Sequence, residues 1–98
     1  MKKKYIYTIT VLEDLGPLSD RRCWCWMPSL KDAKRAVEIN DGDIHERSYG
    51  YAVIEKVPCY LYGAPYREWW YKWDEAKESY FSIDKPEEIK NICAFSIG

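Results

Sequence analysis

Two segments near the start of the chain alternate between opposite faces with a period of two residues. Residues 5–12 do so with tyrosines and β-branched side chains, and residues 21–27 repeat the pattern after a connection that contains Gly16 and Pro17. Alternation of this composition is typical of β-strands, so we predict two antiparallel strands joined by a loop. In the second strand, one predicted face carries Cys23, Cys25 and Met27, and the other carries Arg22, Trp24 and Trp26.

The next segment has the spacing of an amphipathic helix. Ser29 and Asp32 are placed as an N-cap and an acidic residue of the first turn. The apolar residues of the segment fall along one stripe, which consists of Leu30, Ala33, Ala36, Val37 and Ile39. Gly42 is suited to the left-handed conformation beyond the last turn. We therefore predict a helix from Ser29 to Asn40 that packs on a sheet.

The second half of the chain returns to the period of strands. Residues 49–57 predict a third strand, because aromatic and aliphatic side chains alternate there. Residues 69–74 and 79–83 flank a polar tetrapeptide and predict a β-hairpin. A helix over residues 67–79 is the alternative, because Trp69, Trp73 and Ala76 also fit helical spacing.

The chain closes with a short helical turn over residues 84–90, where Pro86 fits the first turn, and with a last strand over residues 91–97. The predicted order of elements is therefore ββαβββαβ. This order predicts an α+β fold, an antiparallel sheet with one main helix packed on one face. The length of 98 residues, 47% of them hydrophobic, predicts a single domain over residues 1–98.

Charge excludes several classes of partner. Lys and Arg total 15 and Asp and Glu total 16, which leaves a formal net charge of −1 and no overall field to attract duplex nucleic acid or a membrane. Three lysines precede the first apolar segment, but Thr8 and Thr10 interrupt that segment and no signal-peptide cleavage site follows. We therefore expect a cytoplasmic protein, with no membrane partner.

The chain contains cysteine, histidine and acidic residues, but they are not spaced as a metal site or a catalytic site requires. Cys23, Cys25, Cys59 and Cys93 are expected to be free thiols of a reducing compartment. A zinc site from Cys23, Cys25, His45 and Cys59 can be drawn, but Cys-x-Cys on a strand holds its ligands apart. The acidic residues around Gly42 lack a calcium-loop register. We expect no metal, no cofactor and no enzymatic activity.

Aromatic residues are concentrated in residues 65–73. The candidate binding residues of this segment are Tyr66, Arg67, Trp69, Trp70 and Trp73. Exposed rings of this kind stack on bases or form the energetic centre of protein interfaces, and alternate rings can also simply cover a sheet. Because alternate residues of a strand face opposite sides, both sets of rings cannot be interior in a sheet with one helix. Some of them are therefore expected to contact solvent or a partner.

A second candidate patch lies on the second predicted strand. It consists of Arg22, Trp24 and Trp26, with Arg21 beside it. Stacking of Arg22 between the two indoles would stabilise the sheet without any ligand, by about 0.5–1 kcal/mol if the side chains are exposed. The sequence leaves open whether the two patches are neighbours.

Most of the chain resembles short uncharacterised proteins of Firmicutes bacteria and their phages. The segments that carry the resemblance are residues 29–38, 40–44, 51–57, 68–74, 85–88 and 95–98. The resemblance brings no activity or active-site motif with it. It implies a small phage-borne domain in the cytoplasm of a bacterial host, which binds a host component, including parts of antiviral defence.

These observations favour a non-enzymatic binding protein, encoded by a phage or a mobile element, that occludes a host protein through its aromatic surface. Exposed rings also favour self-association, so a small homo-oligomer is expected. The alternative is a protein that sequesters a nucleotide-like signal molecule. In that case indoles would clamp the base, and Arg21, Arg22 or Arg67 would contact the phosphates.

Overall fold

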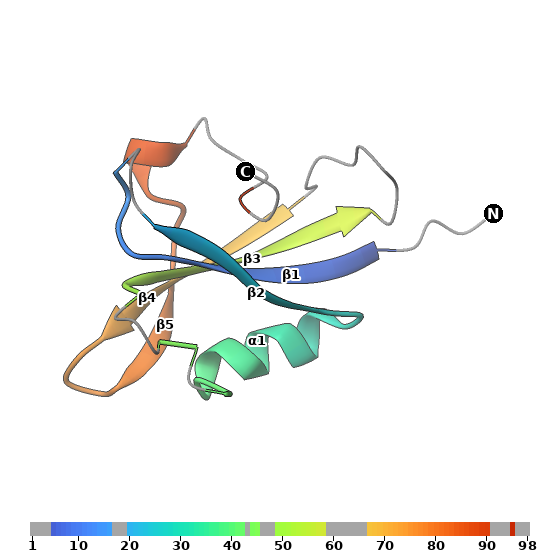
Figure 1. Ribbon diagram of the computed structural model, residues 1–98, viewed down its shortest axis with the longest axis horizontal. Helices are drawn as coiled ribbons and strands as arrows, with labels where there is room; N and C mark the ends of the chain where they lie inside the picture. Colours follow the sequence, from blue (N-terminus) through green and yellow to red (C-terminus); the bar gives the residue numbers. More distant parts are fainter. Residues whose placement is uncertain are drawn as a thin grey trace.

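The computed structural model describes residues 5–16, 20–42, 44–45, 49–58, 67–90 and 95. Their elements are, in chain order, β1 (Tyr5–Leu12), β2 (Arg21–Met27), α1 (Leu30–Glu38), β3 (Tyr51–Pro58), β4 (Arg67–Asp74), β5 (Ser79–Ile83) and the 3-10 turn η1 (Glu87–Ile89). The strands form one antiparallel sheet in the order β2-β1-β3-β4-β5. Helix α1 lies along one face of the sheet, here called the helix face, and η1 lies on the opposite, far face (Figure 1).

The predicted fold class is confirmed, and the predicted order of elements is wrong. An α+β fold with an antiparallel sheet and one main helix is present, but the second predicted helix is only the three-residue turn η1. Pro86 stands directly before η1, and the turn ends within one residue of Ile89, too short for an α-helix. The predicted last strand lies outside the described residues except for Phe95, which is in a turn.

The hairpin prediction is confirmed against the helical alternative. Strands β4 and β5 pair from Trp70 opposite Ile83 to Asp74 opposite Ser79, and residues 75–78 form the turn between them. The Asp74 carboxylate accepts hydrogen bonds from the backbone N–H groups of Ala76 and Lys77 at 2.9 and 3.3 Å. This local bonding competes with a helix and closes the turn.

Helix α1 begins as the sequence predicts. The Ser29 hydroxyl accepts a hydrogen bond from the Asp32 N–H at 3.4 Å, and the helix buries Ala33, Ala36 and Val37. Its end differs in detail, because the residue directly after the C-cap is Asn40, with a φ of 52°, and Gly42 has a φ of 64° two residues later. Asn tolerates this left-handed conformation better than most residues with a Cβ.

The sheet separates two hydrophobic cores. On the helix face, α1 packs against a set of residues that includes Ile9, Val11, Ile54 and Tyr71. The far-face core comprises Leu12, Val53, Trp70, Ile89 and Phe95. Beside it, the Glu55 carboxylate is fully buried and accepts a hydrogen bond from the Phe95 N–H at 3.1 Å. Both faces of the sheet are therefore covered near its centre.

The predicted faces of β2 are wrong because the strand contains a β-bulge. Cys25 pairs with Ile9 and Cys23 pairs with Thr10, so two residues of β1 oppose three residues of β2 and Trp24 is the extra one. Ile9 points to the helix face and its neighbour Thr10 to the far face. Cys25 and Met27 therefore lie on the helix face, while Cys23 and Trp26 lie on the far face.

No helix among the described residues is both long and apolar enough to cross a membrane.

Candidate binding surface

A group of aromatic and basic side chains lies at one end of the helix face. Its members come from β1, α1, β3 and β4, and we call them the basic aromatic surface: Tyr5, Tyr7, Lys34, Lys56, Arg67 and Trp69. The antiparallel register assembles most of it, because Lys56 pairs with Tyr7 on one side and with Arg67 on the other. Residues paired in this way share a face of the sheet.

Each cation of the basic aromatic surface lies over an aromatic ring. The Lys56 Nζ is 4.5 Å from the centre of the Tyr5 ring. The Arg67 Cζ and the Lys34 Nζ are 4.9 and 5.8 Å from the centre of the Trp69 ring. The Tyr7 ring lies 6.1 Å from the same indole at an interplanar angle of 58°. These contacts hold three long side chains in place, so the side chains lose less conformational entropy when a partner binds.

The three cations of this surface form no ion pair with a described carboxylate. The whole sequence carries a formal net charge of −1, so three cations in one place are a local concentration of positive charge. An aromatic ring attracts a cation through its quadrupole but does not cancel its charge. The surface is therefore electrostatically suited to an anionic partner.

The structure separates the aromatic residues that the sequence grouped in residues 66–73. Arg67 is exposed and Trp69 is half-buried, and both belong to the basic aromatic surface. Trp70 points to the far face, is 2% exposed, and donates a hydrogen bond from Nε1 to the Glu68 Oε1 at 2.9 Å. The sequence analysis was wrong to include Trp70 in the candidate site. The side chains of Ile89 and Phe95 cover the far face at this point and bury the Trp70 ring. Tyr66 lies outside the described residues.

Trp73 has a structural environment that the sequence did not predict. Its ring stacks on His45, with centroids 3.7 Å apart and planes 7° apart, and meets the Tyr80 ring edge-on at 5.0 Å. Tyr80 is buried in the helix-face core, against which Trp73 packs. This geometry makes Trp73 and His45 part of one aromatic cluster, at a different place in the fold from the basic aromatic surface.

The second predicted patch is also divided by the sheet. Arg22 lies over Trp24, with its Cζ 5.4 Å from the ring centre, which confirms half of the predicted stack. Trp26 projects from the opposite face and is 61% exposed. The bulge at Trp24 is the cause, because it shifts the alternation of the strand by one residue. Arg22 and Trp26 therefore cannot contact the same side of a partner.

The two cysteines that the structure describes, Cys23 and Cys25, give no sign of nucleophilic activation, and Cys59 and Cys93 lie outside the described residues. Partial burial raises the pKa of both the Cys23 and the Cys25 thiol, which keeps them protonated at neutral pH. The two side chains also point to opposite faces of the sheet. In the described part of the chain, no three His, Cys, Asp or Glu side chains are grouped closely enough to hold a metal ion.

Sequence reasoning missed four members of the basic aromatic surface, namely Tyr5, Tyr7, Lys34 and Lys56. Tyr5 and Tyr7 were correctly placed on one face of a strand, but their neighbours across the sheet depend on the strand order. The only signal for Lys34 was its position at the border of the apolar stripe of α1. Sequence alone does not show which strand that border faces.

Comparisons of this chain with protein families, with curated proteins and with solved structures found no match. Nothing in them indicates a family, an activity or a source. We therefore infer a function from the arrangement of the side chains alone.

Proposed function

We propose that this protein is a non-enzymatic binding protein that occludes an acidic patch of a partner protein with its basic aromatic surface. The observation that carries the proposal is the set of three cations, Lys34, Lys56 and Arg67, each held on a ring and none paired with a described carboxylate. Arginine and aromatic side chains together dominate the energetics of protein interfaces. Complementary charge adds speed and specificity to such an encounter.

The packing of the Trp69 ring favours a protein partner over a small molecule that stacks on this ring. The Trp69 ring is already in contact with Lys34, Arg67 and Tyr7, which leaves it less free to stack on a base.

We further propose that the protein is encoded by a phage or a mobile element. Its partner would then be a host protein, such as a component of antiviral defence. The resemblance of the sequence to phage proteins supports this part. Identification of the partner would test it independently of the surface.

A second candidate function is the sequestration of a nucleotide-like signal molecule. One observation favours it, because Lys34 and Arg67 lie over the same indole and a phosphate group between them would receive two cations. Because the Trp69 ring is already in contact with other side chains, such a ligand would bind through its phosphates more than through its base.

Isothermal titration calorimetry with an octaglutamate peptide tests the proposal. We expect binding that weakens as salt is added, because exposed charge pairs are screened. A triple variant, Lys34→Gln, Lys56→Gln and Arg67→Gln, should weaken binding about tenfold. Each exposed ion pair contributes roughly 0.5 kcal/mol, and the loss of all three together corresponds to about that factor in the dissociation constant. The matched control replaces the exposed Lys31, Lys77 and Lys90 with Gln and removes the same charge.

The control variant should bind the peptide as the unmodified protein does. Equal weakening by both triple variants would mean that net charge, and not this surface, drives binding, and would refute the proposal. ATP serves as the nucleotide probe in the same experiment. Binding of ATP with no binding of the peptide would replace the proposed function with the second candidate.

A further inference from the structure

A small apolar hollow lies on the far face, at the end of the sheet where η1 lies (Figure 1). It encloses about 190 Å³. Its apolar lining comes from the end of β1, the connection to β2, η1 and the residue at position 95, and consists of Leu12, Leu15, Ile89 and Phe95. All four belong to the far-face core or pack against it. The volume is below the range of about 300–1,000 Å³ that is typical of sites for drug-sized ligands, so the occupant is a smaller molecule.

Charged side chains line the same hollow, namely Asp14, Arg21 and Glu88. Arg21 opposes Leu12 across the β1–β2 pair, so both side chains lie on the far face. The Arg21 Cζ lies 5.5 Å from the centre of the Phe95 ring, a contact that holds the guanidinium in place and leaves it N–H donors for a ligand. Within the described residues, neither the Arg21 nor the Glu88 side chain forms a hydrogen bond or an ion pair. One cation and one carboxylate therefore line the hollow without neutralising each other.

These charges select among small apolar ligands. A simple carboxylate would meet the Arg21 guanidinium, but also the negative charges of Asp14 and Glu88. An alkyl amine would meet Glu88, but also the positive charge of Arg21. The Asp14 carboxylate already accepts a hydrogen bond from the Gly16 N–H at 2.7 Å, so it is less available to a ligand. A molecule with both a carboxylate and an ammonium group would pair with Arg21 and Glu88 together, and its apolar part would cover the apolar lining.

We propose that this hollow binds a free aliphatic amino acid of about the size of leucine. Its α-carboxylate would accept hydrogen bonds from Arg21, its α-ammonium group would donate to Glu88, and its side chain would lie against Leu12, Ile89 and Phe95. The volume of the hollow equals that of about six water molecules in the liquid, which suits a branched aliphatic amino acid. The site lies on the opposite face of the sheet from the basic aromatic surface, so this inference goes beyond the proposed function and does not depend on it.

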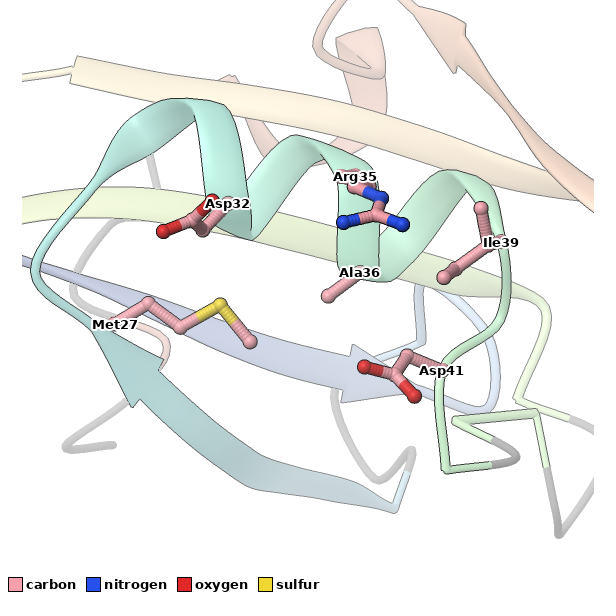
Figure 2. Close-up of a pocket in the computed structure, with 6 residues that line it drawn as sticks. All are labelled: Met27, Asp32, Arg35, Ala36, Ile39 and Asp41. Atoms are coloured by element: carbon pink, nitrogen blue, oxygen red, sulfur yellow. The ribbon is translucent and has the colours of Figure 1, made fainter.

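The larger hollow between β2 and α1 does not combine these properties. It encloses about 400 Å³. Figure 2 shows the Arg35 guanidinium between the Asp32 and Asp41 carboxylates, with Met27 below the helix. The lining is thus largely polar and contains its own cation between its two anions. We therefore expect this hollow to stay empty of an aliphatic amino acid, and it serves as the internal control.

Titration with L-leucine, followed in nitrogen-15 correlation spectra, tests the proposal. We expect saturable shifts of the Ile89 and Phe95 N–H peaks with a dissociation constant below about 1 mM, and no shift of the Met27 and Ala36 peaks in the other hollow. Isocaproate lacks the ammonium group and isoamylamine lacks the carboxylate, so each should bind at least about tenfold more weakly. No saturation at about 10 mM leucine, or binding of either analogue as tight as that of leucine, would overturn the proposal.

Two matched pairs of variants test the two polar contacts. Arg21→Gln should weaken leucine binding about tenfold, whereas Arg22→Gln, a change on the opposite face of the same strand, should leave it unchanged. Glu88→Gln should weaken it about threefold, because this carboxylate is exposed. Glu87→Gln should have no effect, since Glu87 pairs with Lys90 and does not line the hollow. Equal weakening by both members of either pair would contradict the assigned contacts.

The selectivity of the variants separates a lost contact from a disturbed fold. Arg21→Gln should bind leucine and isoamylamine alike, because the partner of the carboxylate is gone. Glu88→Gln should bind leucine and isocaproate alike, because the partner of the ammonium group is gone. Circular dichroism establishes that each variant is folded. A folded Arg21→Gln variant that still prefers leucine over isoamylamine by the original factor would overturn the proposal.

Discussion

At the scale of single residues, the face of the sheet decides what each tryptophan does. Trp69 and Trp70 are neighbours in sequence, yet one holds two cations near the surface and the other fills the far-face core. Trp70 also packs edge-on against Phe95, with ring centroids 5.1 Å apart. The stability of the protein should therefore depend on Trp70 and its binding on Trp69.

Trp70→Ala should lower the free energy of unfolding by about 3–5 kcal/mol, the cost of removing a large ring from a packed core. Phe81→Ala removes an exposed ring from the far face of β5 and should cost less than about 1 kcal/mol. Urea titration of both variants measures the difference. Equal losses would mean that the far face is not packed as described.

Tyr71 makes stability depend on alkaline pH. Burial, with a smaller contribution from the Glu38 charge, raises the pKa of its hydroxyl to about 12. An unfolded tyrosine has a pKa of about 10, so the folded state holds this proton more tightly. The resulting stabilisation is complete below about pH 10 and is lost as the pH rises through 12.

We therefore expect the unmodified protein to lose more stability than Tyr71→Phe between about pH 9 and pH 11.5. The comparison uses the change in unfolding free energy with pH, so any constant cost of the substitution cancels. A variant that loses as much as the unmodified protein would show that another group is responsible.

At the scale of elements, periodicity and turn residues were sufficient to predict five strands and the main helix. They favoured a hairpin over residues 69–83 and left a helix over residues 67–79 open, and the pairing of β4 with β5 decides for the hairpin. They did not predict the bulge in β2, because an extra residue leaves the alternation of Arg22 to Met27 unchanged in the sequence and appears only in the pairing with β1. The length of η1 was overestimated because a helix of one turn and one of two turns begin with the same residues.

The turn of the β4–β5 hairpin carries local strain that a substitution can remove. Glu78 has a φ of 50°, a left-handed conformation that is unfavourable for residues with a Cβ. Glu78→Gly should raise the free energy of unfolding by roughly 0.5–1 kcal/mol, since glycine adopts this conformation without the clash. Lys77→Gly, in the same turn but with no positive φ, should lower it. Thermal unfolding of the two variants makes the comparison, and destabilisation by both would contradict the assigned conformation.

At the scale of the whole molecule, the candidate surface depends on strand order. The sequence predicted Arg67 and Trp69 as binding residues, but Tyr7 and Lys56 join them only because β3 lies between β1 and β4. The expectation that one side of the sheet would be open failed at the far face, where Ile89 and Phe95 cover Trp70. Surplus aromatic surface is found at Trp26 on the β2 edge and at Phe81 on β5.

Anionic partners should bind at Trp69 and the cations beside it, and the five tryptophans of the chain allow a direct test. Each indole N–H gives one cross-peak in a nitrogen-15 correlation spectrum, which is followed as octaglutamate peptide is added. We predict that the Trp69 peak shifts with the peptide and returns on addition of salt, while the peaks of the buried Trp70 and the exposed Trp26 stay in place. A shift of Trp26 with no shift of Trp69 would contradict it.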